Sequence, residues 1–142
     1  MNATARKFGF PETLLAELEH WLVLLRPAQV TLGSLVLVCR EEARRFGEIS
    51  RAAGAELALA TGRIEAALAG AFQNDKINYL MLMMVDPDVH FHVIPRYAAE
   101  RRYQGHCFTD PFWPGPPDVR TQQDLPEPIR AQLLRDLRAR FG

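Results

Sequence analysis

Polar and apolar residues alternate from residue 88 to residue 93, in the order Asp-Val-His-Phe-His-Val. In an extended strand, side chains two positions apart point to the same face and lie roughly 7 Å apart along the chain. The pattern therefore predicts a strand with one apolar face and a row formed by Asp88, His90 and His92 on the other. A lone strand histidine is usually a half-buried polar residue, but two at this spacing, with a carboxylate in register, indicate a functional site.

The apolar segment before this row, residues 77–85, predicts the partner strand of an antiparallel hairpin. Asp86-Pro87 then predicts a two-residue turn between the strands. In that register Met83 lies opposite His90 and Met81 opposite His92. Because cross-strand neighbours share a face, the two thioethers are expected to form part of the floor of the site. Core packing is the alternative for these methionines, and more so for Met84.

Helices are predicted from capping residues and from apolar positions about four residues apart. Ser50 is a suitable N-cap for a long helix that reaches about residue 72. Pro11-Glu12-Thr13 predicts the start of a short helix with Leu14, Leu15 and Leu18 on one side. The apolar stripes of the long helix and of a C-terminal helix are Leu57, Ile64, Leu68 and Phe72, and Ile129, Leu133, Leu137 and Phe141.

Two further strands are predicted at residues 21–25 and 34–39, on either side of a loop that begins at Arg26. The elements together predict an α+β fold with a mainly antiparallel sheet of about five strands, one long helix and shorter flanking helices. We expect a single domain over residues 1–142 with a core at 8–97. Residues 98–142 are expected to form an irregular proline-rich wrap and a C-terminal helix.

Charge and cysteine content narrow the classes of function. The chain has 17 basic and 17 acidic residues and a formal net charge of +0, so no global field favours nucleic acid or an anionic membrane. Cys39 and Cys107 form no CxxC motif and are typical of free thiols in a reducing compartment. The N-terminal segment is short and polar, and no apolar run approaches the ~18 residues of a membrane span. We expect a cytoplasmic protein without nucleic-acid or membrane partners.

Two chemistries suit the row of Asp88, His90 and His92. A neutral imidazole nitrogen is a good nucleophile towards phosphorus near pH 7, since its unperturbed pKa is about 6.5. Such a nucleophile needs a hydrogen bond on its other nitrogen and donors around the phosphate oxygens. Alternatively, the three residues form a facial triad for iron, zinc or manganese. Ligands only two residues apart approach a metal from one direction, which argues against that alternative.

Residues 89–96, Val-His-Phe-His-Val-Ile-Pro-Arg, resemble the signature of the histidine triad (HIT) family. In that signature three histidines alternate with apolar residues before an apolar pair and, often, Pro-Arg. The strands around Arg26 and Gly33, the long helix and the second strand pair follow in the family's order over residues 8–97. The resemblance implies a HIT-like fold and usually a homodimer. It also implies a nucleotide hydrolase or nucleotidyl transferase that uses no cofactor or metal.

The family's substrates are dinucleoside polyphosphates such as diadenosine polyphosphates, nucleoside phosphoramidates and related nucleotides, attacked at the α-phosphate. By resemblance, the nucleophile is His90, and His92 hydrogen-bonds the phosphate oxygens. The first histidine of the family is replaced by Asp88, which we include among the catalytic candidates because it can orient another group. Its charge would also repel a phosphate chain. A noncatalytic nucleotide-binding dimer is therefore a further alternative.

Four other residues are predicted to bind substrate. A ribose-contacting position of the family falls on Arg26, which can instead bind phosphate or be a solvated loop residue. Gln29 and Ser34 are weaker candidates in the same loop. Arg96 can neutralise phosphate, although an arginine at a strand end commonly pairs with a surface carboxylate.

Overall fold

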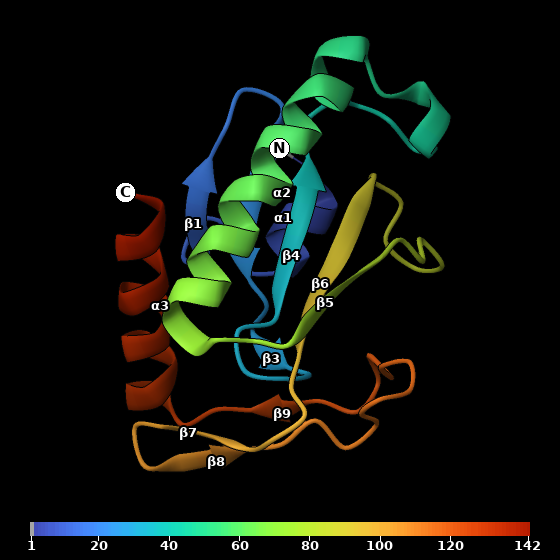
Figure 1. Ribbon diagram of the computed structural model, residues 1–142. Coiled ribbons are helices and arrows are strands. Elements are labelled where there is room, and N and C mark those ends of the chain that lie inside the picture. Colours follow the sequence, from blue (N-terminus) through green and yellow to red (C-terminus); the bar gives the residue numbers. More distant parts are fainter. Residues whose placement is uncertain (1) are drawn as a thin grey trace.

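An antiparallel sheet in the order β1-β2-β4-β6-β5 organises the computed structural model, which describes residues 2–142 (Figure 1). Its strands are β1 (Leu14–Glu17), β2 (Trp21–Leu25), β4 (Leu35–Cys39), β5 (Lys76–Leu80) and β6 (His90–Arg96). Two short ribbons pair β3 (Ala28–Gln29) with β9 (Gln123–Asp124), and β7 (Arg101–Tyr103) with β8 (His106–Phe108). The predicted α+β fold with a five-stranded antiparallel sheet is confirmed.

Helices cover both faces of the sheet. The long α2 (Arg51–Phe72) crosses in front of β4, whereas the short α1 (Ala3–Lys7) lies behind the sheet (Figure 1). A single 3-10 turn, η1 (Phe46–Glu48), precedes α2, and α3 (Glu127–Phe141) ends the chain. The hydroxyl of Ser50 accepts a hydrogen bond from the amide of Ala53 at 3.0 Å, so the predicted N-cap of α2 is confirmed. Within residues 2–142, no helix has the length and apolarity to cross a membrane.

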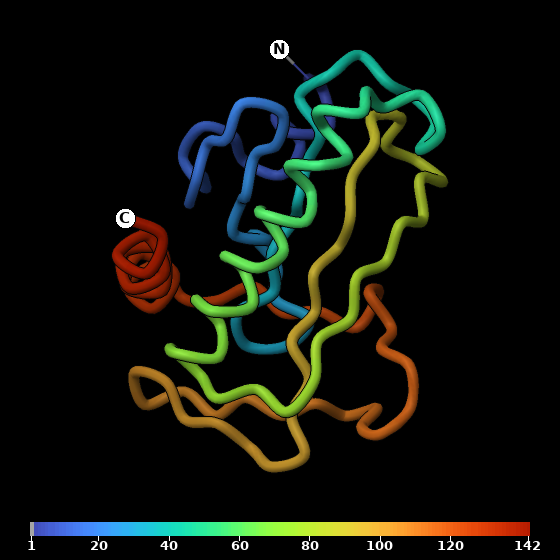
Figure 2. The backbone as a smooth tube through the Cα atoms, turned by 45° about the horizontal axis from the view of Figure 1, so that its top comes forward, coloured from blue at the N-terminus to red at the C-terminus, as the bar shows by residue number. Residues whose placement is uncertain are grey.

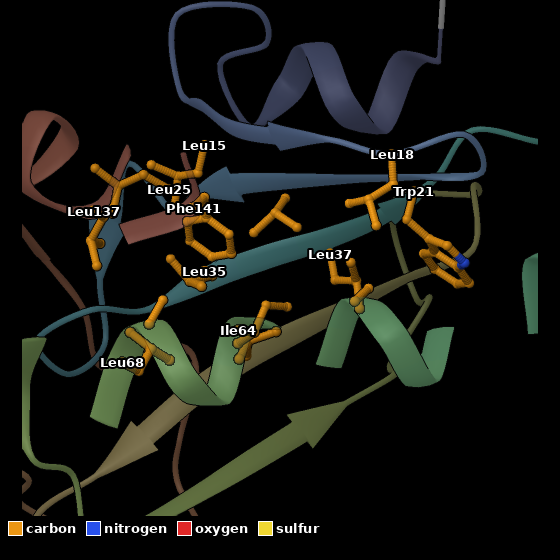
Figure 3. Close-up of a cluster of buried hydrophobic side chains, with 14 of the residues drawn as sticks. Leu15, Leu18, Trp21, Leu25, Leu35, Leu37, Ile64, Leu68, Leu137 and Phe141 are labelled. Atoms are coloured by element: carbon orange, nitrogen blue, oxygen red, sulfur yellow. The ribbon is translucent and has the colours of Figure 1, made fainter. Parts of the chain in front are cut away.

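The main core lies between the sheet and α2, with α3 at one side. Figure 3 shows Leu35 and Leu37 of β4 facing Ile64 and Leu68 of α2. The alternate residues of β4, Val36 and Val38, point to the opposite face of the sheet. There they pack in a smaller cluster with Ala5 and Phe8. Because both faces are covered, β2 and β4 are apolar at every position rather than alternating.

The proline-rich segment after β6 wraps along one end of the sheet (Figure 2). A buried ion pair holds it there: Arg96 Nε donates to Asp110 Oδ2 at 2.6 Å, and Arg96 Nη2 donates to Asp110 Oδ1 at 3.0 Å. The same guanidinium donates to the Gly115 carbonyl and to Asn78 Oδ1, each at 2.8 Å. The exposed fractions of the two charged side chains are 4% and 2%. The wrap is therefore tied to the sheet by desolvated, directional contacts.

The prediction of a short helix after Pro11 is wrong. Residues 14–17 form β1, in which Leu14 pairs with Leu24 and Glu17 pairs with Leu22. The first helix lies earlier, at Ala3–Lys7, a segment with no clear periodicity. Pairing with β2 outweighs local helix signals here, because β2 would otherwise leave one backbone edge unpaired.

The prediction of a two-residue turn at Asp86-Pro87 is also wrong. The strand β5 ends at Leu80, which lies opposite His92, and a connection at residues 81–89 joins it to β6. Residues in the second half of this connection bond to α1 and to the Ala43 carbonyl rather than to β5. Met83 has a positive φ of 50°, and Met84 is 88% exposed, so core packing is excluded for Met84.

The buried ion pair between Arg96 and Asp110 predicts a loss of stability when the proline-rich segment is released from the sheet. Asp110→Ala leaves Arg96 charged and buried without its carboxylate, which is expected to lower the free energy of unfolding by about 3–5 kcal/mol. Urea unfolding followed by circular dichroism measures this change. Glu127→Gln removes the carboxylate of an exposed pair with Arg130 and is expected to cost no more than about 1 kcal/mol. Equal effects of the two variants would contradict the assigned role.

Candidate active site

His90 and His92 lie side by side on one face of β6. Their ring centroids are 5.2 Å apart, and the two residues are 2% and 7% exposed. Phe91, between them, points to the other face and packs against Trp21 and Phe46 at centroid distances of 6.2 Å and 5.6 Å. The alternation predicted for the two histidines is thus confirmed.

Asp88 precedes the first residue of β6, and its side chain contacts α1 rather than the two imidazoles. Its carboxylate oxygen Oδ2 accepts hydrogen bonds from the backbone amide and hydroxyl of Thr4, at 3.2 Å and 3.0 Å. The side chain lines a groove with Asn2 and Arg44 that is separate from the histidine pocket. The carboxylate thus lies on the α1 side of the sheet, as the two imidazoles do, but it bonds to Thr4 and does not line the histidine pocket.

The backbone of Asp88, by contrast, contacts the first histidine directly. Its carbonyl oxygen lies 2.7 Å from His90 Nδ1. A carbonyl oxygen only accepts, so Nδ1 must carry the proton of this hydrogen bond. In the neutral imidazole, Nε2 then holds the free lone pair. The contact sets both the tautomer and the ring orientation of His90.

The two imidazoles form part of a pocket of about 580 Å³. Phe8, at the end of α1, lies over both rings, with centroid distances of 6.0 Å to His90 and 5.7 Å to His92. The remaining walls come from the end of α1, the loop after β2, the connection before β6 and the segment before β9: Lys7, Arg26, Pro27, Ala28, Leu82, Met83, Met84, Val85, Asp86, Val119, Arg120 and Gln122. The pocket lining thus combines basic side chains with apolar ones.

Arg26 is the buried cation of this pocket. It is 7% exposed, and its Nη1 donates to the Ala28 carbonyl and to Gln122 Oε1, each at 2.6 Å. A longer bond of 3.4 Å joins Nη2 to the Val119 carbonyl. Its Nε is buried without a hydrogen-bond partner among residues 2–142. Burial lowers the pKa of the guanidinium, and all of its acceptors are neutral.

The other cations of the pocket differ from Arg26, because each already has a carboxylate partner. Lys7 Nζ lies 2.9 Å from Asp86, and Arg120 Nη2 lies 3.0 Å from Asp118. Both are more exposed, with side-chain exposures of 52% and 88%. The buried positive charge that lacks a counter-ion in this part of the described chain is therefore that of Arg26.

His92 is held in the neutral form. Burial, followed by the nearby charges of Arg26 and His90, lowers the pKa of His92 from 6.5 to about 4. Its Nδ1 is buried and has no hydrogen-bond partner among the described residues. The charge of Arg26, which lies near enough to lower the pKa of His92, is one that a bound anion would compensate.

Three predicted substrate-binding residues lie outside the pocket. Gln29 bonds only to backbone, donating to the Arg26 and Ser34 carbonyls and accepting from the amides of Gly33 and Ser34. The Ser34 hydroxyl closes the same loop on Thr31. The guanidinium of Arg96 is bound by the carboxylate of Asp110. Of the four candidates, only Arg26 is brought to the histidines.

Several pocket residues carry no sequence signal. Lys7 and Phe8 end a helix too short for periodicity to indicate, and Arg120 and Gln122 lie in an irregular segment about 30 residues after the histidines. Their contribution follows from tertiary packing alone. Met83 was predicted as a floor residue and does line the pocket, although from the connection rather than from β5.

The fold that holds this pocket is similar to that of several solved structures. No family model and no curated protein matches the sequence. Similar solved structures include a histidine triad (HIT) protein from Sinorhizobium meliloti, 22% identical, with a TM-score of 0.76 over 99% of this chain and 95% of that one. A histidine triad protein from Marinobacter aquaeolei is 25% identical, with a TM-score of 0.72 over 90% and 87%. A hypothetical histidine triad nucleotide-binding protein from Sulfolobus tokodaii is 18% identical, with a TM-score of 0.69 over 91% and 83%.

The depressed pKa of His92 predicts a pH dependence. In the folded protein its imidazole stays neutral down to about pH 4, whereas in the unfolded chain it binds a proton below about 6.5. The unfolded state therefore binds more protons between these values, and the stability contributed by neutral His92 is lost as the pH falls from 6.5 to 4. Ring-proton NMR titration, with the His92→Gln variant for assignment, is expected to give a midpoint near 4. A midpoint near 6.5 would contradict the burial argument.

Proposed function

This chain is a histidine triad protein by fold, and from that premise we propose that it is a nucleotide hydrolase or nucleotidyl transferase with His90 as its nucleophile. The observation that carries the proposal is the 2.7 Å hydrogen bond between His90 Nδ1 and the Asp88 carbonyl. It leaves Nε2 as the reactive nitrogen in a pocket that also holds a buried cation. An imidazole fixed in this tautomer is suited to attack on phosphorus.

The reaction has two displacements at the α-phosphorus. Nε2 of His90 forms a bond to phosphorus, and the leaving group departs with the electron pair of the broken P–O or P–N bond. The nucleotidyl group is then attached to His90, whose positive charge is stabilised by the Asp88 carbonyl. Water attacks in the second step, breaks the P–N bond to His90 and yields the nucleoside monophosphate. Transfer results if another acceptor replaces water.

Arg26 and His92 are suited to bind the reacting phosphate. A buried charge normally has a counter-ion, and Arg26 has only neutral acceptors. A phosphate oxygen would supply the opposite charge and accept charge-assisted hydrogen bonds. Neutral His92 has one N–H to donate to the same group. The stabilisation grows as negative charge develops on the phosphate oxygens in the transition state.

The apolar wall is suited to the uncharged part of a nucleotide. Phe8, Pro27, Leu82 and Val119 present carbon surface in the same pocket as Arg26 and the two histidines. Ligand pockets generally combine such apolar walls with a few polar groups that fix orientation. We propose that a nucleoside binds these apolar side chains with its α-phosphate towards the histidines.

The metal-binding alternative lacks a third ligand. The carboxylate of Asp88 faces Thr4 rather than His90 and His92. In the described part of the chain, no three His, Cys, Asp or Glu side chains are grouped as a metal site. The noncatalytic alternative shares the pocket with the proposed enzyme, so kinetics must separate the two. A homodimer also remains a proposal; the outer edge of β5 pairs with no strand of the described chain and offers a surface for it.

The nucleophile is tested by His90→Ala. The variant is expected to lose at least about three orders of magnitude in kcat on any nucleotide that the parent turns over, because the proposed intermediate forms on His90. Substrates are screened among dinucleoside polyphosphates and nucleoside phosphoramidates. Trapping without acid, followed by mass spectrometry, should find the nucleotidyl group on His90. The matched control is His20→Ala, a histidine outside the pocket; an active His90→Ala enzyme would overturn the assignment.

The proposed binding of phosphate by Arg26 is tested by comparing the variants Arg26→Gln and Gln122→Ala. Both changes break the hydrogen bond between Arg26 and Gln122 in the segment before β9, but only the first removes the cation. Arg26→Gln is expected to lower kcat/KM by about 10- to 100-fold, the value of one charge-assisted contact to phosphate. Gln122→Ala is expected to change it much less. Equal losses in steady-state kinetics would mean that Arg26 acts only by holding that segment.

A further inference from the structure

Asp88 is joined to the start of α1 by three hydrogen bonds, two through its carboxylate and one through its backbone amide. Its Oδ2 accepts from the Thr4 amide at 3.2 Å and from Thr4 Oγ1 at 3.0 Å, and its backbone amide donates to the same hydroxyl at 3.3 Å. Thr4 is 1% exposed and Asp88 is 7% exposed. The nearest cation is Arg44, whose Nε is 3.8 Å from Oδ1 on a side chain that is 70% exposed, so the Thr4 donors are the close partners.

The position of α1 depends on contacts of this kind. The helix has five residues, and isolated helices shorter than about 12–15 residues are marginal in water. It is joined to the connection before β6 at two points, by Thr4 and Asp88 near its start and by Lys7 and Asp86 at its end. Buried Ala5 and the Asn2 contact to the Cys39 carbonyl attach it to the sheet.

Two features of the pocket depend on the same linkage. Phe8, directly after α1, covers both imidazoles, and Lys7 stands at the pocket rim. The residue that α1 holds through its carboxylate and amide is also the residue whose carbonyl orients His90. Movement of α1 away from Asp88 would therefore uncover the imidazoles and loosen the nucleophile together.

We propose that Asp88 is a positioning residue whose carboxylate holds α1 against the residues that precede the nucleophile. The hydrogen bonds between Thr4 and Asp88 are called the latch below. Its charge faces Thr4 and the groove beside Arg44, not the phosphate pocket. A carboxylate suits this latch because one oxygen accepts from both the amide and the hydroxyl of Thr4, whereas a neutral imidazole has a single acceptor nitrogen. The latch rests on the proposed function for its kinetic consequence, but not for its structural one.

Chemical modification tests the latch without any substrate. Diethyl pyrocarbonate acylates accessible neutral imidazoles, and peptide mass spectrometry gives a rate for each histidine. Thr4→Val and Asp88→Ala are expected to raise the rate at His90 by about ten-fold, since each removes buried hydrogen bonds that keep α1 closed. His20 and His106 serve as internal references in every sample.

Conservative variants separate the latch from a general loss of folding. Thr4→Ser keeps the hydroxyl and is expected to keep the parent rate at His90, while Asp88→Asn, which keeps one acceptor oxygen, should fall between the parent and Asp88→Ala. Thr61→Val is the matched control, because its hydroxyl bonds only within α2. If His90 reactivity in folded Thr4→Val and Asp88→Ala equals that of the parent, the latch is overturned.

Kinetics then distinguish this inference from the proposed function. On a substrate of the parent, Thr4→Val should lower kcat about as much as Asp88→Ala does, although Thr4 lies outside the pocket. The double variant should lose little more than either single one, because both changes break one linkage. A loss confined to Asp88→Ala would indicate direct catalysis and overturn the latch. If the parent turns over no nucleotide, the proposed function fails while the modification rates still decide the latch.

Discussion

The pairing of β6 between β4 and β5 is the constraint on which the site depends. Val38 pairs with His90 and Val36 with His92, while the outer side of β6 pairs with β5. A strand held on both edges cannot slip by one residue without moving its apolar face out of the core. Val93 therefore packs towards α2, and the two histidines are fixed on the face that Phe8 covers.

Desolvation then gives these groups their chemical character. The small apolar cluster behind the sheet, with the wall formed by Phe8, excludes water from two imidazoles and one guanidinium. Burial lowers the pKa of His92 and leaves Arg26 a charge with neutral partners only. The same residues on an open surface would be solvated and screened. An otherwise neutral chain thus has a buried positive charge beside its histidines, without a counter-ion in the part of the chain that the structure describes.

Residues chosen from the sequence for their polar groups often prove structural. Gln29 and Ser34 close the loop after β2 on its own backbone, and Arg96 anchors the wrap through Asp110. A loop glutamine or a strand-end arginine has the same composition signal whether it bonds to a ligand or to the chain. The difference lies in which acceptors come within 3 Å after folding, and these are distant in sequence.

The sequence by itself determined the antiparallel α+β fold, the long helix capped by Ser50 and the placement of His90 and His92 on one face, because strand and helix periods act over adjacent residues. It did not determine the register of β5, the position of α1 or the hydrogen-bond partner of the Asp88 carboxylate. These depend on contacts such as that between Thr4 and Asp88, 84 residues apart, whose energies are realised only when the sheet has formed. Tertiary structure alone therefore decided which polar groups complete the pocket.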